Sequence, residues 1–576
     1  MRAVKAITAV MLSIVFCLSA AAQSRTVSGV VTDKNGEPVM GAAVMVSGTT
    51  VGVVTDIDGT FSLGNVPATA VTFDVTCLGY KSQTISVPAT QSVLNIILEE
   101  DDYTLDETVV VGYGTQKKVN LTGAITAVGS KDLENRTTHS ASSMLMGVVP
   151  GLNITSSKGN PSASPSINIR GVTSLTGQSP MVIIDGAEGS LDRVNPNDIE
   201  SISVVKDAAA AAIYGARGAF GVILVTTKSG SADEGTARVN FSGRWGWEQP
   251  TTCTDYETRG YWSVYTSNLF SMNANGSIYF DYNDEDMQEL LKRVNDVTEN
   301  PERPWIVEGT YKGKPAYKYY GNYDYWHTLF NDQHPTQQYN VSVSGGNKIM
   351  KYYVSGAYDR QTGIIKAEPD VFQKYNLRAK LDFKIGKYAN LSNNTSIYNG
   401  AYSYLGVGWL DDAIGYSALR MLACVPVKNP NGEWVYSIPY ATGGVGNGRH
   451  IAYGDKKDVN LEQRQDISNT TELIIKPHET FWLTANFTYR TMQNFDQHRR
   501  ANFVYAGQYI GDAPGKYVSG AGADRLVETY KNTNYLAANA FATYQNSWNG
   551  GAHNFTAVAG VNMETQKAKG LTADGE

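Results

Sequence analysis

A strict alternation of apolar and polar residues runs through the second half of the chain and limits its fold more than any other feature. In the segment 375–385, Tyr, Leu, Ala, Leu, Phe and Ile alternate with Asn, Arg, Lys, Asp and Lys. Successive side chains of a strand point to opposite faces of a sheet, so this segment predicts a strand with one apolar and one charged face. The alternation recurs in 237–247, 339–343, 481–489 and 555–563. We count about nine such segments between Thr236 and Gln566 and expect a large antiparallel sheet.

Two classes of protein share this pattern. A transmembrane β-barrel needs segments of about ten residues with an apolar face toward lipid and a polar face toward the lumen. A large soluble sandwich or barrel alternates as well, because one sheet face packs on a core and the other meets water. Periodicity does not separate the two. Aromatic strand ends such as Trp245, Tyr339 and Tyr489 favour the membrane, since aromatic girdles mark both interfaces of such barrels.

The first 22 residues indicate export. Basic residues at 2 and 5, an apolar run over 7–18 and three alanines at 20–22 are the parts of a cleaved signal peptide. The apolar run is too short to span a bilayer. Cys17 follows Phe16 rather than a small residue, so we expect no lipid anchor.

Composition argues against several functions. The net charge of −7 without a long Lys/Arg run argues against a nucleic-acid partner. Beyond the signal peptide the cysteines are Cys77, Cys253 and Cys424, which are too far apart for a zinc site or a disulfide framework. The seven histidines form no HExxH pattern, and no nucleophile–base constellation stands out. We therefore expect no enzyme, no cofactor and no metal, and an exported metallohydrolase lacks ligands.

Residues 24–99 predict a small all-β domain. Short apolar strands alternate with turn signals such as Asn35-Gly36 and Asp58-Gly59, and about seven strands would make a sandwich. The acidic pair Asp56 and Asp58 suggests calcium, but the rest of a calcium loop is absent, so we interpret it as a turn. The sequence from Gly29 to Leu63 resembles the carboxypeptidase-regulatory-like domain, a name that does not imply peptidase activity.

A linker over 100–118 follows. Within it, Thr108–Val111 predicts a short strand, because β-branched residues favour extended backbone. If it has no pairing strand within the chain, such a strand can add to the sheet edge of another protein. On composition alone the segment also fits an ordinary interdomain linker.

Residues 119–230 have a mixed α/β texture. Apolar strands are predicted at 181–184, 199–206 and 221–228. Asp207 is placed to cap a short Ala-rich helix that Gly215 ends. From the residues alone, this is a small α/β domain without catalytic residues.

Several of its motifs are specific. VVPGLNI, INIRGVTSL, MVIIDG and DIESISVVKDAAAAAIYGARGAFGVILVTTKSG resemble the plug of SusC-family, TonB-dependent outer-membrane transporters (the SusC/RagA type). LDETVVVGYGTQKK resembles that family's linker with its TonB box. The order of sandwich, TonB box, plug and barrel is the family's order, and the resemblance covers 24–576. Phe220 differs from the family, which usually has Asn there, and we expect only altered local packing.

The resemblance implies two sets of site residues. The TonB box comprises Leu105, Asp106, Glu107, Thr108, Val109, Val110 and Val111. The plug motif comprises Arg170, Gly171, Asp185, Gly186, Lys206, Asp207, Tyr214, Gly215, Arg217 and Gly218.

The resemblance also implies a function. It implies TonB-dependent import of an oligosaccharide or peptide through a multi-pass β-barrel in outer-membrane lipid. TonB would supply the energy, and a SusD-like surface lipoprotein would act as a lid. The alternative is an exported, non-transporting β-rich surface adhesin or binding protein, which would need neither a plug nor a TonB box.

Two long polar segments, roughly 248–337 and 403–465, interrupt the alternation and predict outer loops. Their aromatic residues are Tyr261, Trp262, Trp305, Tyr323, Tyr325, Trp326, Trp409 and Trp434. Such residues can stack on sugars, hold a protein lid or pack among themselves, so we assign no ligand contact.

The strand count also bears on the length of the protein. Plugged transporters close with about 22 strands, whereas we find about nine. An open sheet edge in lipid leaves backbone donors and acceptors unpaired. We therefore expect residues 236–576 to be the N-terminal portion of a barrel that continues beyond this chain.

Overall fold

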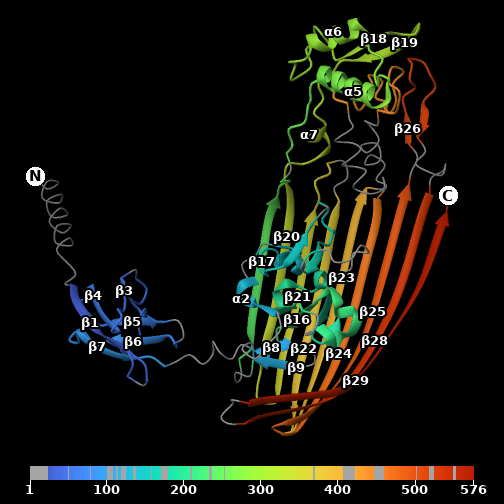
Figure 1. Cartoon of the computed structure of the whole chain (residues 1–576). Coiled ribbons are helices and arrows are strands. Elements are labelled where there is room, and N and C mark those ends of the chain that lie inside the picture. Colours follow the sequence, from blue (N-terminus) through green and yellow to red (C-terminus); the bar gives the residue numbers. More distant parts are fainter. Residues whose placement is uncertain are drawn as a thin grey trace, which may run out of the picture. The chain divides into compact units, whose positions relative to one another are not determined.

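The computed structural model describes residues 24–99, 108–111, 114–117 and 125–575, with internal gaps, the longest of which are 172–178, 406–421, 446–458 and 518–524. The chain divides into two compact units, Met1–Thr122 and Gly123–Glu576, and each is described by itself. The predicted signal peptide lies outside the described residues. Figure 1 shows the elements in chain order.

The first unit contains a sandwich of two sheets, as predicted for 24–99. One sheet has the order β4-β1-β7 and the other β3-β2-β5-β6. Their bounds are β1 Ser24–Thr32, β2 Ala43–Val46, β3 Gly52–Val54, β4 Thr60–Pro67, β5 Val71–Thr76, β6 Gln83–Val87 and β7 Val93–Ile97. Val27, Val44 and Phe73 are fully buried in the shared core, because alternate side chains of each strand point inward.

The predicted turn at Asp56 is confirmed. The Asp56 carboxylate accepts hydrogen bonds from the backbone N–H of Asp58 at 3.1 Å and of Thr60 at 2.7 Å. The Thr60 hydroxyl donates a third bond, at 2.6 Å. Its oxygens therefore stabilise the turn, which Gly59 completes with a φ of 71°. Among the described residues no group of three His, Cys, Asp or Glu side chains could hold a metal ion.

The plug-like region, described from Ile125, is built on a five-stranded sheet of order β10-β15-β16-β13-β14. Its strands are β10 Ile125–Gly129, β13 Met181–Ile184, β14 Ala187–Glu188, β15 Ile199–Val205 and β16 Val222–Thr227, and β11 Leu152–Thr155 pairs with β12 Ser166–Ile169. Short helices are α2 Ser130–Leu133, α3 Ala141–Met144, η3 Leu191–Arg193, η4 Pro196–Asp198 and η5 Ala212–Phe220. The three strands predicted here are confirmed.

The predicted end of the Ala-rich helix at Gly215 is confirmed, because Gly215 has a non-helical backbone with φ 63° and ψ −153°. The η5 segment is of 3₁₀ type and consists of two short helices separated by the kink at Gly215, the second of which runs to Phe220. Gly218 allows the second half to pack closely, because a Cβ there would lie 2.8 Å from the carbonyl oxygen of Ala211. Part of the predicted helix, 208–210, lies outside the described residues.

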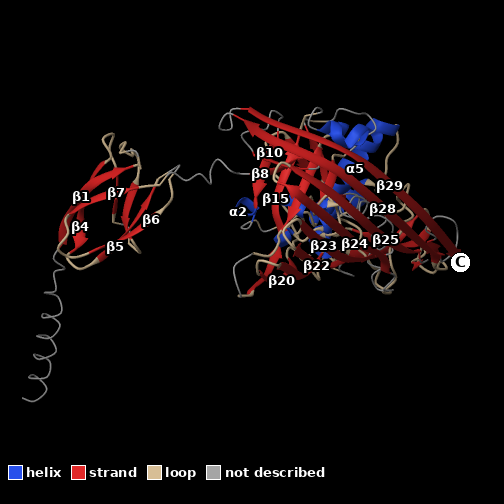
Figure 2. Cartoon of the chain, turned by 90° about the horizontal axis from the view of Figure 1, so that it is seen from below, coloured by secondary structure: helices blue, strands red, loops and turns tan. Residues whose placement is uncertain are grey.

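In the part of the chain that the structure describes, nine antiparallel strands form one sheet, called here the wall, in the order β17-β20-β21-β22-β23-β24-β25-β28-β29. They are β17 Arg238–Glu248, β20 His334–Gly346, β21 Met350–Thr362, β22 Val371–Ile385, β23 Ala389–Leu405, β24 Val459–His478, β25 Phe481–Arg500, β28 Arg525–Trp548 and β29 His553–Gly575. The plug-like region lies against one face of the wall (Figures 1 and 2). The expected large antiparallel sheet is confirmed.

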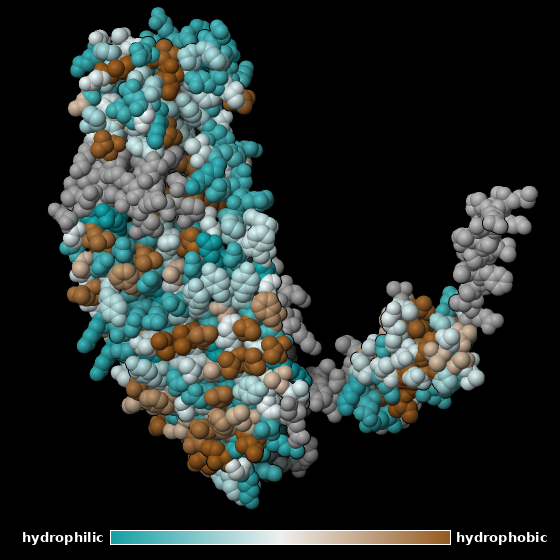
Figure 3. Space-filling view, turned by 180° about the vertical axis from the view of Figure 1, so that it is seen from behind, coloured by the Kyte–Doolittle hydropathy of each residue, from teal (hydrophilic) through white to brown (hydrophobic). Residues whose placement is uncertain are grey.

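The opposite face of the wall is apolar. Exposed side chains there include Val341, Val354, Tyr375, Leu377 and Phe487. Figure 3, seen from behind, shows apolar patches gathered over the lower part of the strands. Among the described residues no helix is long and apolar enough to cross a bilayer.

The segment between β17 and β20 is a folded cap, whereas the sequence predicted only a polar loop. It contains α5 Gly260–Asn275, α6 Asp284–Lys292, β18 Ile306–Tyr311, β19 Lys314–Tyr319 and α7 Tyr325–Leu329. Residues 422–445 share its core, around Val264, Phe280 and Tyr440, and a hairpin of β26 Phe503–Tyr505 and β27 Gly515–Tyr517 lies beyond β25. The cap lies at the upper ends of the strands in Figure 1.

The burial of aromatic residues in the cap shows which of them pack among themselves. Trp305, Tyr325 and Trp326 are buried, so these pack within the cap. Trp262 remains 38% exposed on α5. Trp409 lies outside the described residues.

Candidate functional site

The segment Thr108–Val111 forms a strand, β8, as predicted. It is not unpaired, however, because it pairs antiparallel with β9, Gly114–Lys117, in a two-stranded sheet of its own. The register joins Thr108 to Lys117 and Val111 to Gly114. Leu105, Asp106 and Glu107 of the predicted TonB box lie outside the described residues.

This pairing leaves β8 able to accept another strand. An isolated two-stranded hairpin is marginally stable in water. A second chain can therefore add to the free edge of β8 or replace β9, and either event uses the backbone groups that a strand offers. The sequence missed the internal partner because GTQK carries no strong strand signal.

The second part of the site is the polar contact between the plug-like region and the wall. Strand β22 directs its charged face toward this region, as the alternation predicted. The Nζ of Lys374 donates to the carbonyl oxygen of His139, and the Nδ2 of Asn376 donates to that of Arg193 at 2.7 Å. The Nζ of Lys380 donates to the carbonyl oxygen of Thr227 at 3.2 Å.

Asp185 is the centre of one charge network. Its carboxylate accepts from the backbone N–H of Thr227 at 3.0 Å and from the Nδ2 of Asn394 at 2.6 Å. On the wall, the Nη1 of Arg378 lies 3.3 Å from it and the Nζ of Lys380 lies 3.5 Å from it. Burial raises the pKa of this carboxyl, but the two cations and the Thr227 bonds outweigh burial and lower it.

Asp198 joins the same network with the opposite balance. The hydroxyl of Tyr353 donates to it at 2.9 Å, and the Nε of Arg378 lies 3.7 Å away. Burial dominates here and raises the pKa of Asp198, although Arg378 opposes the rise. One wall arginine, Arg378, therefore faces two carboxylates of the plug-like region while being 6% exposed itself.

A second network lies further along the wall. The Nη1 of Arg193 lies 2.8 Å from the Oδ2 of Asp466 on β24, and Arg490 on β25 donates to the same carboxylate. Arg490 also donates from Nη1 to the carbonyl oxygen of Glu188 at 2.8 Å. Because both cations and the carboxylate are largely buried, this network contributes orientation as well as affinity.

The residues of the predicted plug motif have different positions. Asp185 contacts the wall as described, and Arg217 pairs with Glu188 and, at 2.8 Å, with Glu564 on β29. The Nζ of Lys206 donates instead to Thr126 and to the carbonyl oxygen of Pro150, within the plug-like region. Gly171 and Gly186 have positive φ, Tyr214 is half-buried, and Asp207 precedes an undescribed stretch. Arg170 lies outside the described residues.

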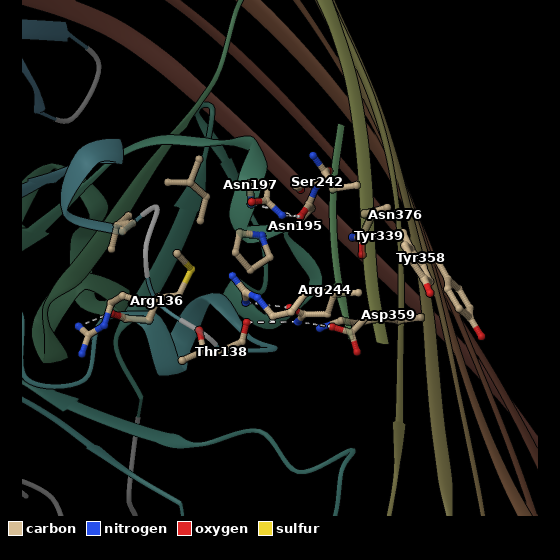
Figure 4. A pocket seen from close by; sticks show the side chains of 18 of the residues that line it. Arg136, Thr138, Asn195, Asn197, Ser242, Arg244, Tyr339, Tyr358, Asp359 and Asn376 are labelled. Atoms are coloured by element: carbon tan, nitrogen blue, oxygen red, sulfur yellow. Dashed lines mark hydrogen bonds between the residues drawn. The ribbon is translucent and has the colours of Figure 1, made fainter. Parts of the chain in front are cut away.

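A cavity of about 160 Å³ separates the plug-like region from β17, β20, β21 and β22. Figure 4 shows Asn195 and Arg136 on one side and Arg244, Tyr339 and Asp359 on the other.

Sequence reasoning named none of the contacts of His139, Arg193 and Asp198. The charged face of the alternating strands could have pointed to these contacts. If another domain covers that face, its charged side chains need polar partners on the covering domain.

Comparison with known proteins agrees with this arrangement. A CarboxypepD_reg-like domain model matches residues 27–110, and a TonB-dependent Receptor Plug Domain model matches residues 117–222. The chain is 32% identical to the TonB-dependent receptor SusC of Bacteroides thetaiotaomicron over 65% of this chain and 35% of that protein. It is 27% identical to the TonB-dependent receptor P3 of Formosa agariphila over 96% of this chain and 49% of that protein.

Solved structures show the same fold. The RagAB peptide importer in its open-open state superposes with a TM-score of 0.62 at 24% identity, over 81% of this chain and 50% of that chain. The chain thus spans between about a third and a half of the length of the curated relatives named here. Given the two domain models, the SusC relationship and the shared fold, the chain belongs to the SusC family of TonB-dependent transporters.

Proposed function

We propose that the protein imports a nutrient across the outer membrane with energy delivered by TonB. The observation that carries this proposal is a small domain bonded through buried charges to the polar face of a wall whose other face is apolar. Such a wall suits lipid on one side and a watery lumen on the other. A domain attached to the lumen face blocks the path until it moves.

The strand β8 supports the coupling step. The strand Thr108–Val111 precedes the plug in the sequence and presents a backbone edge. TonB would pair with this edge and pull on it, and occupation of the lumen would alter how readily the edge is offered. The segments that we assign are a signal peptide at 1–22, a sandwich at 24–99, a linker at 100–118, a plug at 119–230 and barrel strands at 236–576.

The cargo and the lid follow from the family. One structural neighbour is a peptide importer, and we propose an oligosaccharide or a peptide as the cargo. A SusD-like surface lipoprotein would close the outer side, where the cap provides a folded surface at the strand ends. A surface adhesin, the alternative, leaves the bonded plug and β8 without a role.

The decisive experiment replaces Val110 by Pro in the full-length protein. Proline removes a backbone donor from β8 and so prevents regular strand pairing. We expect the binding of the purified TonB C-terminal domain to fall by about tenfold or more, as expected when strand pairing is lost. Growth on those oligosaccharides and peptides that support the wild type should cease.

The matched control is Val110→Ile, which keeps a β-branched residue in the strand. Both variants should reach the outer membrane at equal levels, because β8 pairs only with β9 among the described strands. If the proline variant binds TonB and grows as the wild type does, the coupling role of this strand is wrong.

A further inference from the structure

The contacts between plug and wall are spread unevenly along the chain. Among the described residues of the plug, Thr138 and His139 are the first, counted from β8, that hydrogen-bond to the wall. The two charge networks around Asp185 and Arg193 come much later in the sequence. A force applied at β8 would therefore reach the contact at His139 before either of them.

His139 bridges two wall carboxylates. Its Nδ1 lies 2.9 Å from the Oδ2 of Asp359 on β21, and its Nε2 lies 2.9 Å from the Oε1 of Glu248 on β17. Lys374 on β22 donates to the carbonyl oxygen of His139. The His139 and Asp359 side chains are 17% and 9% exposed, whereas that of Glu248 is 45% exposed, so the Asp359 side of the bridge is buried and the Glu248 side meets water.

This geometry favours a charged ring. A neutral imidazole has one N–H donor, whereas the imidazolium has two, and both nitrogens face carboxylate oxygens here. The Nε2 of Gln338 also lies 2.8 Å from Nδ1. Its two hydrogens have other acceptors, however, since it lies 2.7 Å from the Oδ2 of Asp359 and 3.3 Å from the carbonyl oxygen of Thr138. Nδ1 can therefore donate to Asp359.

Charged groups from every neighbouring element bear on the ring. The wall contributes Asp359, Glu248, Lys374, His334 near Glu248, and Arg244, which donates to Gln338. The plug contributes Asp192, which acts on Lys374, and Arg136, which donates to the carbonyl oxygen of Met144. With a charged ring, the two carboxylates are balanced by His139 and Lys374. Without it, the buried Asp359 carboxylate loses its charged hydrogen-bond donor and keeps the neutral donor Gln338, which is a less favourable arrangement.

We propose that His139 is a positioning residue of the transport cycle: its charged ring anchors the N-terminal part of the plug to β17, β20 and β21, and this anchor opens first when β8 is pulled. The pulling step rests on the proposed function, whereas the anchor itself does not. A deprotonated ring would leave the later networks intact and free only the part of the plug that follows the linker.

The direction of the pH dependence follows from the same contacts. Burial opposes the charged ring, but the bonds to Asp359 and Glu248 outweigh it, so the pKa of His139 is raised from the usual 6.5. A raised pKa means that the anchor contributes fully below pH 6.5 and is lost as the pH rises through the folded-state value. The anchor should hold in mildly acidic medium and loosen in alkaline medium.

Hydrogen exchange on the full-length transporter tests the anchor. Exchange of peptides covering residues 136–149, corrected for the intrinsic rate, is compared between about pH 5.5 and about pH 8.5. We expect the protection of the wild type to fall by about tenfold at the higher pH, the size expected for a hydrogen bond to a charged group. Peptides covering β15 serve as the internal reference.

Three variants separate the charge from the packing. His139→Gln should have low protection at both pH values, and His139→Lys, which keeps a positive charge, should recover part of the protection at both. Asp185→Asn should weaken the later network without changing residues 136–149. A wild type whose protection does not change with pH, or a Gln variant that keeps the dependence, overturns the anchor.

A single-molecule pull from the N-terminus of the mature protein in a bilayer tests the order of release. The first rupture should weaken in His139→Gln and at alkaline pH, while later ruptures stay the same. An unchanged first rupture overturns the positioning role. The proposed function is judged separately by TonB binding and growth of the Val110→Pro strain, so either idea can fail alone.

Discussion

Replacing Arg378 by Met would remove the wall cation that faces two plug carboxylates. Arg378 lies 3.3 Å from the Oδ2 of Asp185 and 3.7 Å from that of Asp198. Because Arg378 is only 6% exposed, water does little to solvate these charges. Met has a similar length and fills the space without charge. The variant therefore tests the charge of this position more than its volume.

The expected cost follows from the partners left behind. Removing one member of a buried ion pair typically costs about 3–5 kcal/mol, because the remaining charge loses its compensation. Asp185 would keep Lys380 at 3.5 Å and its bonds to Thr227. Asp198 would keep the hydrogen bond from the Tyr353 hydroxyl of the wall, at 2.9 Å. We expect a loss of about 3 kcal/mol in the stability of the plug, the lower end of that range.

The measurement is hydrogen exchange of β15 in the full-length transporter at increasing urea concentration, which reports the free energy of plug opening. Lys384→Met is the matched control, because Lys384 lies on the same strand and is exposed, and it should change that free energy by less than about 0.5 kcal/mol. The triple variant Arg378→Met, Asp185→Asn, Asp198→Asn should regain most of the loss. A neutral single variant, or a triple variant as unstable as the single one, would refute the reasoning.

Two further predictions concern single residues. Asp185→Asn should destabilise the plug at pH 7, because the pKa of Asp185 is lowered in the folded state. Its ionised form therefore contributes stability above pH 3.8, and this stability is lost as the pH falls through the folded-state pKa. Asp198→Asn should be neutral or stabilising, because the raised pKa of Asp198 means that its ionisation at pH 7 is unfavourable in the folded state. Hydrogen exchange of β15 at pH 7 compares the stability of the plug in the two variants. A plug that is less stable in Asp198→Asn than in Asp185→Asn would contradict these roles of the two carboxyl groups. Phe73→Ala should cost about 3–5 kcal/mol in a urea titration of residues 24–99 followed by circular dichroism, since Phe73 is fully buried; a loss below about 1 kcal/mol would show that this core repacks.

The strands of the wall were predictable because their signal is local. The alternation in 375–385 depends only on the two faces of one strand, and β22 shows Leu377 exposed on one face and Arg378 buried on the other. The sandwich strands and the turn at Asp56 were predictable for the same reason. The TonB box and plug motif came from a family resemblance, and their roles stay predictions.

The cap was missed because its helix lacks a clean pattern. α5 mixes Tyr, Trp, Phe and Asn around its circumference, so no apolar stripe separates from a polar one. Its burial depends on Phe280 and Tyr440, which are far apart in the sequence and meet in a shared core. Only the packing of distant segments makes this stretch a folded unit.

The sequence by itself determined that the second half of the chain forms strands of a large sheet and which face of the strand 375–385 is charged, because those properties depend on neighbours along the chain. Tertiary structure alone decided which charges meet: Arg378 with Asp185 and Asp198, and His139 with Asp359 and Glu248. An ion pair depends on distance in space, and its partners here come from segments that are more than a hundred residues apart. The polar face of the wall could be predicted from the sequence, whereas the contacts that hold the plug to it could be identified only from the tertiary structure.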